Sequence, residues 1–205
     1  MKTIALMSQK GGAGKTTLAV HLAVAAVDAG ERVVVIDTDP QKSATVWGSS
    51  REAEAPIVAT GSVGDVDRVL AAARGDDMTL AVIDTAPHTA PDAARIARAS
   101  GLIIIPCRPT ALDLAAVEAS VRIVQAAKAR AVLVLSACPP RAPEIAEARA
   151  ALATYDLPVA PVEITERRAF SRAIATGRAV TEFETDGKAA AEIRALWAWL
   201  QKEMP

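Results

Sequence analysis

The chain has 205 residues, with 23 lysines and arginines, 24 aspartates and glutamates, and a formal net charge of −1. Hydrophobic residues make up 51% of it and aromatic residues only 3%, so a buried core has to be built mainly from aliphatic side chains. This composition excludes a disordered chain and a protein coated in basic residues. The two cysteines, Cys107 and Cys138, are too few and too far apart for a disulfide scaffold or a paired-cysteine metal site. No apolar run approaches the ~20 residues that cross a bilayer.

Short aliphatic runs alternate along the chain with longer stretches of helical periodicity. This alternation predicts βαβ units, and therefore an α/β fold with a predominantly parallel, twisted sheet flanked by helices. We find no repeat or linker, so we expect residues 1–205 to form a single domain with no helix-turn-helix domain before it. The expected strands are 3–7, 32–36, 79–83, 102–105, 131–135 and 157–162, and the expected helices are 16–29, 66–74, 91–99, 112–128 and 143–154.

A glycine-rich segment, Lys-Gly-Gly-Ala-Gly-Lys-Thr-Thr at residues 10–17, falls between the first expected strand and the first expected helix. Backbone N–H groups, a helix N-terminus and a lysine together make a phosphate site, and this order of elements is that of a P-loop. Lys15 is placed for the outer phosphates and Thr16 for Mg²⁺. The expected nucleotide contacts are Gly11, Gly12, Ala13, Gly14, Lys15, Thr16 and Thr17.

This loop departs from the common GxxxxGK[ST] pattern, because Gln9 takes the place of the first glycine and Lys10 precedes the glycines. In this it resembles the deviant Walker A motif of the ParA/MinD family of ATPases. The resemblance implies an ATP-bound homodimer in which Lys10 reaches the phosphates held by the partner subunit. Lys10 and Lys15 would then both act on the triphosphate.

Three aspartates follow expected strands. Asp37 and Asp39 come after the second, in Asp-Thr-Asp-Pro-Gln, and Asp84 comes after four apolar residues in the third. The first pair by itself is also compatible with a simple turn. Beside a P-loop, it resembles the second motif of the ParA family, which implies that Asp39 positions the attacking water and Asp37 lies near the metal. The third has the Walker B form, so we expect Thr16, Asp37 and Asp84 around Mg²⁺.

Residues 105–113 contain two prolines after another expected strand and are similar to the proline-rich segment of small partition ATPases such as ParF. The similarity implies that Pro109 and Asp113 lie near the nucleotide and the dimer face. We interpret Cys107 as a small apolar residue. His21 is expected to be structural, whereas His88 follows the Walker B motif and could border the site.

Residues 166–178 carry four arginines against one glutamate, a net charge of +3. Such a stretch is compatible either with a solvated helix face or with salt-sensitive, sequence-independent contact with DNA phosphates. ParA-type ATPases bind DNA non-specifically as ATP-bound dimers, so the resemblance favours the second interpretation. The expected contacts are Arg167, Arg168, Arg172 and Arg178.

The last segment has Ile193, Leu196, Trp197 and Leu200 at helical spacing, which predicts an amphipathic helix. MinD-like proteins end in a membrane-binding helix of this kind. The weak positive charge here favours packing against the sheet, and membrane binding is not expected. Trp199 lies off the apolar face and remains unassigned.

The chain is thus identified as a member of the ParA/MinD family, most similar to small ParF-like partition ATPases. The resemblance implies a dimerising Mg-ATP hydrolase that segregates plasmid or chromosomal DNA, binds DNA in its ATP state and is released when a ParB-like partner stimulates hydrolysis. Such a protein is expected in the cytoplasm, associated with the nucleoid. Two alternatives stay open: a MinD-like or other cargo-positioning ATPase, and a metabolic P-loop ligase or kinase.

Overall fold

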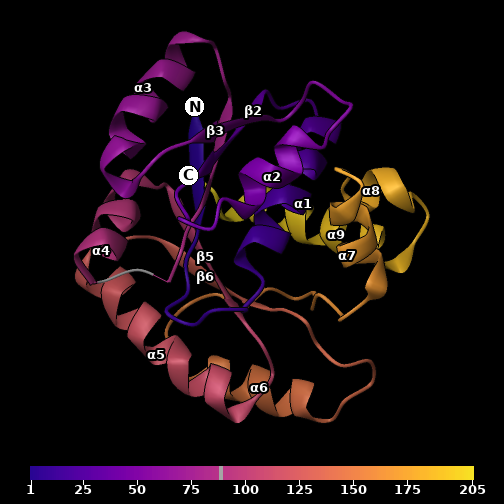
Figure 1. The fold of residues 1–205 in the computed structure, drawn as a ribbon. Helices are drawn as coiled ribbons and strands as arrows, with labels where there is room; N and C mark the ends of the chain where they lie inside the picture. Colours follow the sequence, from indigo (N-terminus) through magenta and orange to yellow (C-terminus); the bar gives the residue numbers. More distant parts are fainter. Residues whose placement is uncertain (88–89) are drawn as a thin grey trace.

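The structure, a computed structural model, describes residues 1–87 and 90–205, so His88 lies outside the described residues. Within these ranges six strands form one parallel sheet in the order β3-β2-β4-β1-β5-β6 (Figure 1). The parallel sheet predicted from the sequence is confirmed. The strands are β1 (Lys2–Leu6), β2 (Val33–Asp37), β3 (Ile57–Thr60), β4 (Leu80–Asp84), β5 (Leu102–Cys107) and β6 (Ala131–Leu135).

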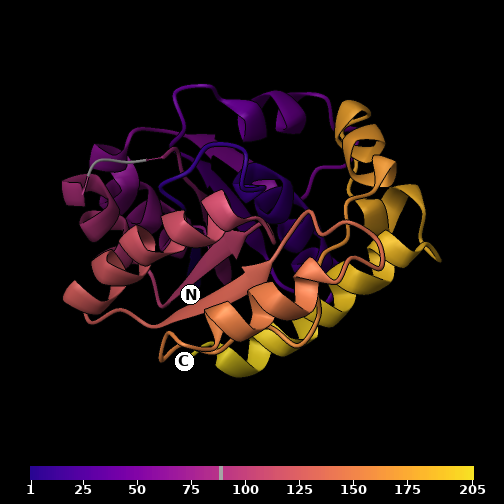
Figure 2. The same ribbon diagram turned by 90° about the horizontal axis from the view of Figure 1, so that it is seen from below.

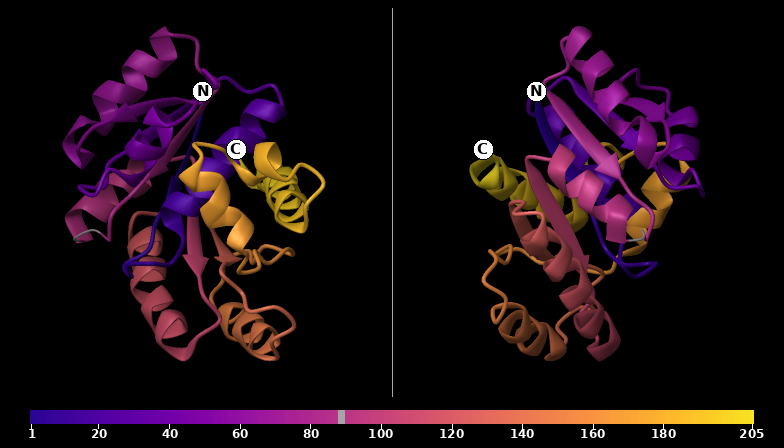
Figure 3. Two further views of the ribbon diagram at one scale, coloured as in Figure 1. Left: turned by 45° about the vertical axis from the view of Figure 1, so that its right-hand side comes forward. Right: turned by 90° about the vertical axis from the view of Figure 1, so that its left-hand side faces the viewer.

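Helices cover both faces of this sheet (Figures 1 and 3). One apolar cluster joins α1, α2 and α7 to α9 to one face, and the other joins α3 to α6 to the opposite face. The helices are α1 (Lys15–Asp28), α2 (Ser43–Ser49), α3 (Val66–Gly75), α4 (Ala90–Ala99), α5 (Ala111–Ala126), α6 (Glu144–Leu152), α7 (Arg168–Ala175), α8 (Val180–Phe183) and α9 (Lys188–Glu203), with a 3-10 turn at Val63–Asp65.

The sheet brings the ends of its central strands to one edge. Every residue of β2, β4, β5 and β6 is buried, as expected for parallel strands covered on both faces. Asp84 is in register with Leu6 of β1 on one side and with Asp37 of β2 on the other. The loop after β1 therefore opens beside both carboxylates. Strands β4 and β5 pair with opposite sides of β1, and ligands of open parallel sheets bind at this kind of switch point. Both chain termini lie near the opposite edge (Figure 2).

One expected strand is wrong. Residues 157–162 make a single bridge to β6, in which Leu133 donates to the Pro158 carbonyl at 2.8 Å and accepts from the Ala160 N–H at 2.8 Å. Pro158 carries no N–H, so the ladder cannot extend toward residue 157. Beyond Ala160 the Leu135 carbonyl accepts from Ile164 and not from Val162, so the pairing does not continue in register. Conversely, the sequence analysis missed β3, a half-exposed edge strand of four residues that begins one residue after Pro56.

The C-terminal helix packs back on the body of the protein, as the sequence predicted. Its four apolar positions, Ile193, Leu196, Trp197 and Leu200, are at most 3% exposed and belong to the core that contains α1. Trp199 is half-buried against the edge of the same core, which accounts for a residue that helical periodicity left unassigned. Among the described residues, no helix is long and apolar enough to cross a bilayer.

Candidate functional site

The glycine-rich loop passes from β1 into α1 through two left-handed residues. Gly12 has φ 74° and Gly14 has φ 91°, a region that glycine occupies without strain. The Ser136 hydroxyl, at the end of β6, donates to the buried Ala13 carbonyl at 2.9 Å and holds the loop from the side. The loop's N–H groups and the N-terminus of α1 consequently converge on one place, which favours the binding of an anion.

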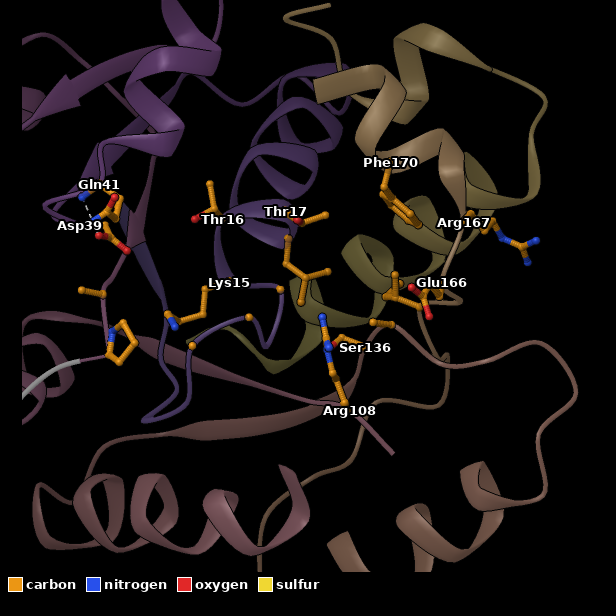
Figure 4. Close-up of a pocket in the computed structure, with 18 of the residues that line it drawn as sticks. Lys15, Thr16, Thr17, Asp39, Gln41, Arg108, Ser136, Glu166, Arg167 and Phe170 are labelled. Carbon is orange, nitrogen blue, oxygen red and sulfur yellow. Dashed lines mark hydrogen bonds between the residues drawn. The ribbon is translucent and has the colours of Figure 1, made fainter. Parts of the chain in front are cut away.

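A cavity of about 740 Å³ opens at this loop (Figure 4). Its walls come from the glycine loop and α1, from the loop after β2, from the ends of β5 and β6, and from the segment that leads into α7. Lys15 and Asp39 point into it from one end, and Phe170 and Glu166 border the other (Figure 4). Its residues also include Gly11, Gly12, Gly14, Thr16, Thr17, Gln41, Arg108, Ser136, Thr165 and Arg167.

Lys15 is an almost fully buried cation, with 6% of its surface exposed. Burial lowers its pKa, while Asp84 and Asp39 oppose the shift. Its ammonium donates to the Lys10 carbonyl at 3.3 Å and makes no salt bridge within the described residues. A buried cation with only one long hydrogen bond is suited to receive a strongly anionic ligand.

Asp84 is fully buried, and neither of its carboxylate oxygens has a hydrogen-bond partner in the described chain. Burial raises the pKa of this carboxyl to about 7, and the negative charges of Asp37 and Asp39 contribute to the rise. The nearby Thr16 hydroxyl opposes the rise, although it forms no hydrogen bond of ordinary geometry. A buried carboxylate without donors fits a nearby cation. The described residues contain no metal-binding group of three or more His, Cys, Asp or Glu. A Mg²⁺ ion that shares its ligands with phosphates and water requires no such group.

The structure gives Asp37 and Asp39 different surroundings. The Asp37 carboxylate accepts hydrogen bonds from both the N–H and the hydroxyl of Thr45 at 2.8 Å, and from the Asp39 N–H at 3.1 Å. It thereby fastens the first turn of α2 to the end of β2. Asp39 reaches the cavity, whereas Asp37 and Asp84 lie buried behind its wall.

The structure also pairs two residues of the predicted site within one chain. The Lys10 ammonium lies 2.8 Å from the Asp113 carboxylate, which also accepts from the Thr110 hydroxyl. Burial alone would raise the pKa of Asp113, but the bonds from Lys10 and Thr110 outweigh it and lower that pKa. Pro109 is buried, and neither it nor Asp113 lines the cavity.

Comparison with known proteins agrees with this geometry. The family model of the CobQ/CobB/MinD/ParA nucleotide binding domain matches residues 4–180. The chain belongs to this family.

Relatives in the family resemble the chain to different extents. It is 31% identical to the maintenance of carboxysome distribution protein A of Gloeobacter kilaueensis, over 99% of this chain and 94% of the relative. It is 32% identical to protein ParA of Rhizobium radiobacter, over 55% of this chain and only 51% of the relative. The structure of the septum site-determining protein MinD from Pyrococcus horikoshii, complexed with Mg-ADP, superposes with a TM-score of 0.80 at 15% identity and covers 98% of this chain and 96% of that one. This likeness confirms the ParA/MinD fold.

In this ParA/MinD-family chain the four predicted DNA-binding arginines do not share one environment. Arg167 lines the cavity and its guanidinium lies 2.6 Å from Glu192 of α9. Arg168 and Arg172 are exposed, four residues apart on α7, and Arg172 stacks over a phenylalanine ring. Arg178 is exposed beyond the end of α7. Three of the four thus remain accessible to a ligand outside the cavity.

The sequence analysis assigned no role to several residues of the site. The cavity is also lined by Ser136, Thr165, Glu166 and Phe170, from segments without a recognised nucleotide motif, and by Arg108 of the proline-containing segment 105–113. Arg108 was visible in the proline-containing segment as an arginine directly after a strand, but its spacing showed nothing about its target. The others could be found only from the folded chain.

His21 is structural, as predicted. It is fully buried in α1, packs edge-on against Phe170 with ring centroids 5.1 Å apart, and accepts a hydrogen bond from the Val180 N–H at 3.2 Å. Burial lowers its pKa to about 3, so the ring is neutral at physiological pH. It thereby connects the phosphate-loop helix to α7 and α8.

Proposed function

We propose that this chain binds and hydrolyses Mg-ATP, dimerises in its ATP state and uses the cycle to partition or position a cargo. The observation that supports this best is the buried Lys15 cation, placed beside the unpartnered Asp84 carboxylate and the cavity-facing Asp39. Family membership supports nucleotide binding. The same set of residues would be a costly arrangement if it served only stability.

Each residue of the site would have a distinct part in hydrolysis. The loop N–H groups and the α1 dipole hold the phosphates, and Lys15 neutralises charge on the outer ones. Thr16 and Asp84 would hold Mg²⁺, which when bound supplies further neutralisation of the phosphates. Asp39, which already faces the cavity, orients a water for attack. Asp37 would act on the metal only indirectly, because its oxygens hold α2.

Dimerisation would use Lys10. Within one chain this lysine is neutralised by Asp113, so it has to leave that partner before it can contact phosphates in a second subunit. The triphosphate offers more negative charge than one carboxylate does, so ATP would favour the exchange. Residues 1–205 would act as a single ATPase domain.

The accessible arginines would contact DNA without sequence preference. Arg168, Arg172 and Arg178 are exposed on and after α7, and a dimer doubles their number. DNA binding in the ATP state would associate the protein with the nucleoid in the cytoplasm. A ParB-like or other adaptor would stimulate hydrolysis and release the dimer from the DNA.

The proposal is tested with Lys15→Ala and wild-type protein. We expect wild type to hydrolyse ATP, to form a dimer with a non-hydrolysable ATP analogue, and to bind random-sequence DNA with an affinity that falls as salt rises. We expect Lys15→Ala not to hydrolyse ATP, not to dimerise and not to bind DNA. Normal ATP turnover by Lys15→Ala would refute the enzymatic part. ATP-loaded wild type that ignored DNA would refute the DNA-carrier part.

A protein body is a second candidate for the cargo. The nearly full-length similarity to proteins named for carboxysome distribution favours it over a plasmid. The two cargoes are distinguished in the source organism by replacing Lys15 with alanine. Loss of a plasmid or a chromosome would indicate DNA partition, and displacement of a protein body with normal DNA inheritance would indicate positioning.

A further inference from the structure

The wall of the cavity farthest from the glycine loop is an extended segment, residues 164–167. Its backbone is held on one side by the end of β6 and the loop that follows: Ile164 donates to the Leu135 carbonyl at 2.9 Å, and Glu166 donates to the Cys138 carbonyl at 2.8 Å. In extended backbone successive N–H groups point to opposite sides. The N–H of Thr165 therefore points away from these partners and needs an acceptor elsewhere.

Glu192 of α9 supplies that acceptor. Its Oε2 accepts from the Thr165 N–H at 3.1 Å, and its Oε1 accepts from the Thr165 hydroxyl at 2.9 Å and from the Arg167 guanidinium at 2.6 Å. The Glu192 side chain is only 16% exposed, so these charge-assisted bonds are partly shielded from water. Both carboxylate oxygens are thus committed to two residues that line the cavity.

The position of this wall bears on the base end of a bound nucleotide. Phosphates held by the glycine loop and Lys15 occupy one end of the cavity. The rest of the nucleotide has to extend toward the opposite end, where Glu166 and Phe170 lie (Figure 4). Thr165 directly precedes Glu166 and lines the same cavity. Helix α9 carries none of the nucleotide motifs found in the sequence, so those motifs do not predict a role for it in the site.

We propose that Glu192 is a positioning residue for nucleotide binding: it holds Thr165 and Arg167 in place as the wall that receives the base and ribose. Arg167 is then part of this wall and not a contact for DNA. This inference rests on the proposed nucleotide binding and names the element that shapes its base end.

The test compares ATP with inorganic tripolyphosphate as competitors of a fluorescent ADP analogue, in the presence of Mg²⁺, on wild-type protein, Glu192→Ala and Glu192→Gln. We expect Glu192→Ala to weaken ATP binding about tenfold, the cost of losing hydrogen bonds to a charged group, and to change tripolyphosphate binding less than about twofold. Glu192→Gln keeps an acceptor for Thr165 but loses the charge beside Arg167, so its loss should be intermediate. The matched control is Glu203→Gln, the same change on the same helix, at a side chain that makes no ion pair or hydrogen bond within the described residues.

A larger loss of affinity for ATP than for tripolyphosphate distinguishes positioning from general stabilisation, because a destabilised fold would bind both ligands more weakly. Equal losses, or no loss of ATP affinity in Glu192→Ala, would overturn the role of Glu192. If Glu192→Ala does not fold, Glu192→Gln and Thr165→Val decide the question by the same comparison. Failure of wild-type protein to bind ATP would instead overturn the proposed function itself.

Discussion

The turn between α7 and α8 packs against the backbone that follows α2, and its glycine, Gly177, allows the contribution of this contact to stability to be measured. Gly177 has φ 67°, and a Cβ atom placed on it would lie 2.2 Å from the Ser50 carbonyl oxygen and 2.8 Å from the Arg51 nitrogen. Both are backbone atoms, so they cannot move aside like a flexible side chain. The Gly177 carbonyl also accepts from Arg51 at 2.9 Å, and Trp47 donates to the neighbouring Arg178 carbonyl at 3.1 Å.

We expect Gly177→Ala to lower the free energy of unfolding by about 2–5 kcal/mol. The left-handed backbone costs an alanine about 1–2 kcal/mol. Relief of the clash moves the turn away from Ser50 and breaks at least one of the two partly buried hydrogen bonds, which adds about 1–3 kcal/mol for each group left unpaired. The Arg51–Glu182 ion pair, at 2.8 Å across the same contact, would weaken as well.

Urea denaturation followed by circular dichroism measures this difference, with Gly30→Ala as the control. Gly30 has φ 90° but nothing within 4 Å of a Cβ placed on it, so its replacement carries the backbone cost alone. We therefore expect Gly177→Ala to be the less stable variant by about 1–3 kcal/mol. Equal stability of the two variants would refute the reasoning, because it would show that the contact with Ser50 carries no energy.

Three further predictions address titration, the buried carboxylate and the arginine helix. Burial holds the pKa of His21 at about 3, below the ordinary value of 6.5, so below pH 6.5 the unfolded chain binds a proton that the folded chain does not. The free energy of unfolding should therefore fall by about 2.5 kcal/mol between pH 7 and pH 4.5 on account of His21. Urea denaturation should show a smaller fall for His21→Asn, which keeps an acceptor for the Val180 N–H. Equal falls in the two proteins would contradict this. Asp84→Asn removes an unpartnered buried charge, so urea denaturation at pH 8 without magnesium should show it to be more stable than wild type by on the order of 2 kcal/mol. Calorimetry should show that the variant has lost magnesium-dependent ATP binding. A destabilised variant would count against an unpaired carboxylate. Replacing Arg168 and Arg172 with glutamine should lower the slope of log DNA affinity against log salt by about 0.9 for each DNA phosphate that the arginines no longer neutralise, and should leave ATP affinity unchanged, whereas an unchanged slope would place the DNA elsewhere.

Sequence reasoning succeeded wherever the physical cause is local. The glycine segment joins β1 to α1 as predicted, and a run of aliphatic residues that ends at Asp84 makes a buried parallel strand. It failed where a single residue type interrupts a pattern. Residues 157–162 look like a strand by hydrophobicity, but Pro158 has no N–H to donate to β6, and beyond Ala160 the Leu135 carbonyl accepts from Ile164 in place of Val162.

The order of motifs and aliphatic runs was thus enough to predict the family and the parallel sheet, and it indicated which residues to propose for phosphate, metal and water. The partners of the charged residues, in contrast, follow from the folded arrangement. Asp37 holds α2 while Asp39 faces the cavity, Lys10 pairs with Asp113, and Arg167 pairs with Glu192. A charge pairs with whatever the fold brings within about 4 Å, and spacing along the chain does not encode that distance. The Arg167–Glu192 pair also joins the last helix of the chain to the wall of the nucleotide cavity.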